Sequence, residues 1–157
     1  MIDAKRRILL KGSLAAGAVG VAVGAGLLAP RAVLAAWPEA AFAATDVKSA
    51  IKALLGIEAG EAGGDITIKA PEIAENGAVV QVSVDSTLAG VKRMVIIAEG
   101  NQTPLIASFD LGEDALPSVT TRIKMGKTAN VQALVQTADK TFTAAKEVKV
   151  TIGGCGG

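Results

Sequence analysis

A single cysteine near the C-terminus is the residue of this chain best suited to covalent chemistry. The chain ends in Gly153, Gly154, Cys155, Gly156 and Gly157. Cys155 is the only cysteine among 157 residues. Glycine has no side chain to pack and loses the most backbone freedom on ordering, so we expect a flexible arm with a thiol near its tip. The alternative is a flexible terminus without a role.

The local sequence does little to activate this thiol. A free thiol has a pKa near 8.5, so only about 3% is thiolate at pH 7. No lysine or arginine lies within the last seven residues. We therefore expect the active site of a partner enzyme to activate Cys155, which makes the protein a carried substrate rather than a catalyst.

Other catalytic residue types are scarce. The chain has no histidine and no tyrosine, which removes the commonest general base and the commonest metal ligand. The glycine cluster from Gly60 to Gly64 lacks the lysine of a phosphate-binding loop and the dinucleotide fingerprint, and is interpreted as a linker. The sequence thus predicts no catalytic, cofactor-binding or metal site.

The N-terminus has the pattern of an export signal. Arg6 and Arg7 precede a long apolar stretch and the small residues up to Ala35, as in a twin-arginine signal peptide. We expect residues 1–35 to be removed on export to the periplasm, with cleavage after Ala43 as the alternative. Because glycines dilute the apolar run, no permanent membrane anchor is expected after cleavage.

Export changes both the charge and the redox argument. Residues 1–35 hold five of the 16 basic groups and one of the 15 acidic groups, so the mature chain has a net charge of −3. That charge does not favour nucleic-acid binding. A lone thiol in an oxidising compartment stays free, pairs with another molecule or carries a substrate.

The remaining sequence indicates a β-sandwich after a short helical segment. Residues 36–60 are expected to be a helical segment with one short helix, capped by Thr45 and ended by Gly56. Trp37 and Phe42 should pack it onto the domain. Residues 61–152 then show period-two alternation between turn signals, and seven strands are expected at 66–69, 80–84, 91–98, 105–111, 119–125, 131–137 and 141–152. Part of the last stretch should be loop, because Ala144, Ala145 and Lys146 are weak strand formers.

This pattern predicts a mainly β fold, an immunoglobulin-like antiparallel sandwich of about seven strands with a flexible arm at 153–157. Between the first two strands, Glu75, Asn76 and Gly77 should form a turn with positive φ.

The signal, the strand pattern and the Gly-Gly-Cys-Gly-Gly tail resemble the SoxY family of sulfur carriers. Residues 37–42 (Trp-Pro-Glu-Ala-Ala-Phe) are similar to the family's mature N-terminus, and residues 71–80 to its Pro-x-x-Ala-Glu-Asn-Gly segment. Gln81 stands where the family pattern has proline. The resemblance covers nearly the whole chain, and the tail is its most specific part.

The resemblance implies that thiosulfate-derived sulfur is carried covalently on Cys155. It also implies a heterodimer with SoxZ, which the turn at 75–77 could contact. The loaded arm would visit a SoxAX-type cytochrome, a SoxB-type hydrolase and a sulfane dehydrogenase, and the redox centres would all sit on these partners.

Three other functions remain open from the sequence. The chain could be a sandwich subunit tethered to another chain by a Cys155 disulfide. It could be a SoxY-like paralogue in another oxidation pathway. A ubiquitin-like carrier activated at its terminal carboxylate is disfavoured by the export signal and by the strand-rich pattern.

Overall fold

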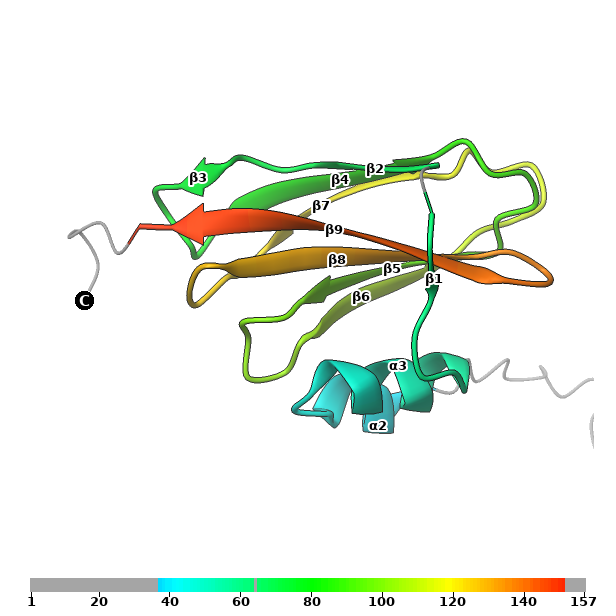
Figure 1. The fold of residues 1–157 in the computed structure, drawn as a ribbon, viewed down its shortest axis with the longest axis horizontal. Helices are drawn as coiled ribbons and strands as arrows, with labels where there is room; N and C mark the ends of the chain where they lie inside the picture. Colours follow the sequence, from blue (N-terminus) through cyan, green and yellow to red (C-terminus); the bar gives the residue numbers. More distant parts are fainter. Residues whose placement is uncertain (1–36, 64, 152–157) are drawn as a thin grey trace, which may run out of the picture. The chain divides into compact units, whose positions relative to one another are not determined.

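Two stacked β-sheets with two helices on one outer face make up the described part of the protein (Figure 1). The structure is a computed structural model, and it describes residues 37–63 and 65–151. It confirms the prediction of a mainly β sandwich preceded by helix.

The larger sheet has β9 as its longest strand. In spatial order it contains β1 (Glu61–Ala62), β9 (Thr141–Val150), β8 (Ala129–Gln136), β5 (Arg93–Ala98) and β6 (Leu105–Asp110). A further short strand, β3 (Ile73–Ala74), also pairs with β9. The smaller sheet contains β2 (Ile66–Lys69), β4 (Val80–Ser86) and β7 (Ser118–Ile123).

The alternation of β4 shows how the sequence builds the core between the sheets. Val80, Val82 and Val84 are buried, and Gln81 between them is exposed. Strand geometry sends successive side chains to opposite faces, so this pattern buries one face of the small sheet. The same cluster receives Met94 from β5 of the facing sheet.

The strand β5 is apolar on both faces because the large sheet is covered on both. Its Met94 and Ile96 join the core between the sheets. Val95 and Ile97 face the other way and pack with Ile51 of the helical segment. A continuous apolar run is the pattern of a strand buried on both faces.

The helical segment contains two helices rather than the single one predicted. They are α2 (Glu39–Ala43) and α3 (Val47–Leu55). Thr45 is not the cap of α3, because the carboxylate of Asp46 accepts a hydrogen bond from the Ser49 backbone N–H at 2.9 Å. The predicted C-cap is confirmed, since Gly56 is left-handed with φ 72°.

The two aromatic side chains predicted to pack on the domain differ in how far they are buried. Phe42 packs against the cluster between the helices and the large sheet. Trp37 is 68% exposed, and its ring stacks on Phe42 with centroids 4.3 Å apart. Only Phe42 therefore anchors the helical segment as expected.

Other corrections concern the short strands and the last strand. The expected linker at residues 60–64 contains β1, and β3 lies between two predicted strands, so the described residues hold nine strands rather than about seven. Both β1 and β3 run parallel to β9, whereas the other pairs are antiparallel. Finally, β9 is continuous through Ala144, Ala145 and Lys146, without the expected loop.

Candidate functional site

The predicted site residues lie outside the described residues. These are Cys155, the glycines Gly153, Gly154, Gly156 and Gly157, and the signal residues Arg6 and Arg7. What the structure does describe is the place from which the tail continues. We call Lys149, Val150 and Thr151 the arm root.

On one edge of β9, the arm root is supported by backbone hydrogen bonds from the segment 72–77. Strand β3 runs parallel to the end of β9 on the edge away from β8, with Ala74 in register with Val150. The Lys149 N–H donates to the Glu72 carbonyl at 2.9 Å, and the Thr151 N–H donates to the Ala74 carbonyl at 3.1 Å. This segment is thus a short strand laid along the end of β9 (Figure 1).

On the opposite edge of β9, the support is a side chain. The last register pair of β8 and β9 at this end joins Ala129 to Val148. One residue earlier in the chain, the Thr128 hydroxyl accepts a hydrogen bond from the Val150 N–H at 2.9 Å. The hydroxyl therefore continues the hydrogen bonding of the sheet past the end of β8.

The turn at residues 75–77 closes against the same place. Its Gly77 carbonyl accepts a hydrogen bond from the Met125 N–H at 2.7 Å. A Cβ on Gly77 would lie 2.4 Å from the Met125 carbonyl oxygen and 2.8 Å from Val150 Cγ1. A turn is present, but it lies slightly later than predicted, at Gly77 and Ala78, where the Val79 N–H donates to the Asn76 carbonyl at 3.2 Å. The expectation of positive φ is wrong, because only Gly56 and Gly90 have positive φ among the described residues. Gly77 is needed for close approach instead.

We call the segment 72–77, Met125 and Thr128 together the root collar. Asn101 holds the loop that contains Met125. Its side-chain amide donates a hydrogen bond to the Lys124 carbonyl at 2.7 Å and accepts one from the Gly126 N–H at 3.1 Å. The surface beside the root is partly apolar, since Ile73 and Val79 are each 57% exposed.

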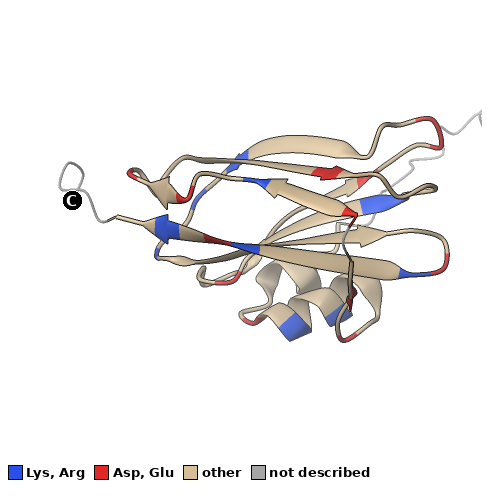
Figure 2. Ribbon diagram, turned by 45° about the horizontal axis from the view of Figure 1, so that its top comes forward, with Lys and Arg blue, Asp and Glu red and all other residues tan. Residues whose placement is uncertain are grey.

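Charges around the described domain are mixed in sign. Figure 2 shows basic and acidic residues interspersed, with neither sign gathered on one sheet in that view. On the small sheet, Asp85 accepts a hydrogen bond from the Ser118 hydroxyl at 2.6 Å and pairs with Lys69 at 2.9 Å. Both contacts, the one from Ser118 most, lower the pKa of Asp85. A carboxylate held ionised on a sheet face is suited to structure rather than to proton transfer.

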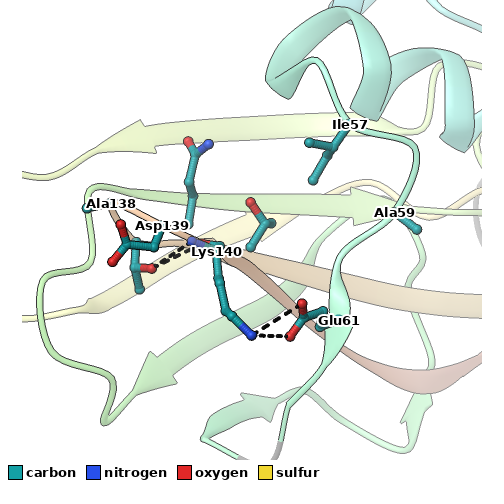
Figure 3. A pocket seen from close by; sticks show the side chains of 9 residues that line it. Ile57, Ala59, Glu61, Ala138, Asp139 and Lys140 are labelled. Atoms are coloured by element: carbon teal, nitrogen blue, oxygen red, sulfur yellow. Dashed lines mark hydrogen bonds and ion pairs between the residues drawn. The ribbon is translucent and has the colours of Figure 1, made fainter.

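An open pocket of about 280 Å³ lies at the other end of β9 (Figure 3). The β8–β9 hairpin and the irregular segment that leads into β1 form it, and Lys140 pairs with Glu61 across it at 3.1 Å. The ten residue steps from Thr141 to Thr151 span roughly 33 Å. Four residues from Thr151 to Cys155 reach at most about 14 Å. The pocket is therefore beyond the reach of the thiol of the same chain.

Neither a metal cluster nor a membrane-spanning helix is found in the described ranges. No three His, Cys, Asp or Glu side chains gather there in a way that could hold a metal ion. No helix there has the length and apolar character needed to cross a bilayer.

The collar was not foreseen from the sequence. Thr128 and Met125 carry no local signal, because their role depends on residues more than 20 positions away. The segment 71–80 was singled out, but as a turn and a partner contact rather than as a support for the tail.

Comparison with known proteins identifies relatives of the chain. A family profile described as sulfur oxidation protein SoxY matches residues 51–155. Among solved structures, the sulfur carrier protein SoxY from Chlorobium limicola f thiosulfatophilum superposes with a TM-score of 0.59 and 42% identity, covering 66% of this chain and 94% of that one. No curated protein sequence matches.

A second structural relative shares the fold alone. The superoxide reductase (neelaredoxin) from Ignicoccus hospitalis superposes with a TM-score of 0.50 and 20% identity, covering 55% of this chain and 80% of that one. The first match confirms the predicted immunoglobulin-like class of the sandwich.

Proposed function

The chain belongs to the SoxY family of sulfur oxidation proteins, and from this premise we propose that it carries sulfur covalently on Cys155. The observation that carries the proposal is the extent of the family match, which runs from α3 to Cys155 itself. The tail thus belongs to the family pattern together with the domain. As a member of a carrier family, the protein is acted on by partner enzymes and needs no active site of its own.

The proposed chemistry is that of thiols and persulfides. The Cys155 thiolate and thiosulfate lose two electrons to a SoxAX-type cytochrome and form a cysteine S-thiosulfonate. Water then releases sulfate and two protons at a SoxB-type hydrolase, which leaves a persulfide. A sulfane dehydrogenase removes six electrons and six protons as three waters supply oxygen, giving a second sulfonate that hydrolysis removes.

Export and partnership complete the proposal. Arg6 and Arg7 direct the chain to the periplasm by the twin-arginine route, and SoxZ is the stable partner. Cleavage after Ala35 rather than Ala43 is supported by the position of α2. Ala41 is fully buried and Phe42 packs beside it, so cleavage after Ala43 would remove part of the apolar cluster between the helices and the large sheet.

The test is the intact mass of the mature protein from thiosulfate-grown cells, with and without a thiol reductant. We expect reductant-sensitive sulfur adducts on the native chain and none on Cys155→Ser, because serine forms no persulfide. A bare thiol, or a Cys155 disulfide dimer alone, would contradict the carrier role and favour a tethered subunit. Adducts formed only with another sulfur compound would favour the paralogue. The same spectrum gives the cleavage site.

A further inference from the structure

We propose that the root collar fixes the pivot of the arm at Thr151, and so limits the volume that Cys155 can sample, with Thr128 as the positioning residue. The inference rests on the proposed function, because reach matters only if Cys155 is delivered to a partner. The contacts that support it all lie within residues 72–151.

Successive residues of the arm root form hydrogen bonds on opposite edges of β9. The Lys149 and Thr151 N–H groups donate to the segment 72–77, and the Val150 N–H donates to Thr128 on the other edge. Strand ends usually fray, because their last backbone groups lack partners on one or both edges. Here the N–H groups of all three arm-root residues have partners. The strand β9 therefore extends two residues beyond Val148, where its register pairing with β8 ends.

The collar is also packed, which makes it a fixed support rather than a loose loop. Ala74 and Met125 are 6% and 2% exposed. Gly77 allows the turn to approach the Met125 carbonyl and Val150 more closely than any side chain would permit. Well-packed groups of this kind move little and transmit displacement to their neighbours.

The position of the pivot changes the volume that Cys155 can sample. From Thr151, four residue steps bring Cys155 at most about 14 Å away. If the root were released back to Val148, the free segment would be seven steps, about 25 Å long. The limit along the axis of β9 would stay the same, because Val148 to Thr151 already spans about 10 Å in the strand. Cys155 could, however, swing sideways and back along the domain through a larger volume. The local concentration of the thiol at a nearby partner site would fall roughly twofold, since it scales as about the −3/2 power of length.

The experiment measures the reach directly on the full mature chain. A nitroxide is attached to Cys155 and a second one to a Gln81→Cys substitution, at an exposed position on β4. Pulsed electron spin resonance then gives the distance distribution. In Thr128→Val, which keeps the side-chain shape but removes the hydroxyl, we expect the distance distribution to broaden, because a pivot at Val148 lets the same length of chain point in more directions.

Two matched variants separate positioning from folding. Thr120→Val also loses a side-chain hydrogen bond, to Ser83 at 2.8 Å on the small sheet, and should leave the distribution unchanged. Thr128→Ser restores the hydroxyl and should restore the native distribution, even if Thr128→Val folds poorly.

Hydrogen exchange supplies an independent readout. The backbone N–H groups of Val150 and Thr151 should be protected in the native chain, and at least tenfold less so in Thr128→Val. Unprotected native amides, or a Thr128→Val distribution equal to the native one, would overturn the inference. Both readouts are independent of sulfur loading, so a chain that showed the shift but never carried sulfur would refute the proposed function alone.

Discussion

At the scale of single residues, the sequence identifies reactive groups better than supporting ones. Cys155 stands out because it is unique in composition and flanked by glycine. Thr128 cannot be recognised in the same way, because a threonine before a strand is ordinary and its value comes from Val150, 22 positions later. Gly77 is intermediate, since the sequence marks a special glycine but suggests the wrong reason for it.

Gly77→Ala tests that reason. The added Cβ would lie 2.4 Å from a backbone oxygen, so the turn or the Met125 loop must shift. We expect a loss of about 1–3 kcal/mol in the free energy of unfolding, the usual cost of overpacking. Chemical denaturation of the two proteins measures it.

Gly112→Ala is the matched control, because nothing lies within 4 Å of its Cβ position and its φ is not positive. That substitution should be neutral or stabilise by about 0.4–1 kcal/mol, through the unfolded chain. Equal effects of the two substitutions would contradict the argument from close approach.

At the scale of elements, the charged carboxylate of Asp46 stabilises the start of α3 through hydrogen bonds. The Ser49 side chain and then the Ser49 backbone N–H lower the pKa of Asp46 below its usual value. A depressed pKa means that the folded state favours the ionised carboxylate, so this stabilisation is fully present above the unfolded pKa of about 3.9. It is lost as the pH falls through the lower folded value.

Asp46→Asn tests this link, because asparagine keeps the capping oxygen without the charge. Denaturant midpoints should be measured from pH 7 down to pH 2.5. Above about pH 4 the native chain should be more stable than Asp46→Asn, and this difference in stability should shrink at lower pH. Asp46→Ala also loses the cap and should stay less stable at every pH. A gap between native and Asp46→Asn that did not change with pH would contradict a role for the charge.

Strands with a clear local pattern were predicted well, and the exceptions have a common physical cause. Strand β4 alternates in sequence and in the structure. By contrast, β1 and β3 each have two residues and exist because β9 offers an edge to pair with. A neighbour also keeps β9 continuous through Ala144 and Ala145, since their pairing with β8 outweighs their weak intrinsic strand preference.

At the scale of the whole molecule, the carrier arm and the folded domain are expected to be separable in stability. The core between the sheets and the core beneath the helices are both built from residues between 41 and 150. A thiol that is repeatedly loaded and unloaded changes charge and size at the tip of the chain. If the tip took part in folding, each intermediate would alter the stability of the domain. We therefore expect the domain to fold without the tip, which would avoid that coupling.

Two truncations of the mature chain test where this separation lies. Removing residues 153–157 should leave the Tm unchanged, because both cores, as far as the structure describes them, are built from residues between 41 and 150. Removing residues 149–157 deletes three backbone hydrogen bonds and the packing of Val150, which together contribute about 3 kcal/mol or more. For a domain of this size the Tm should fall by more than about 10 °C. If the shorter truncation lowered the Tm as much as the longer one, the tail would be part of the fold, and chemistry at Cys155 would be coupled to the stability of the domain.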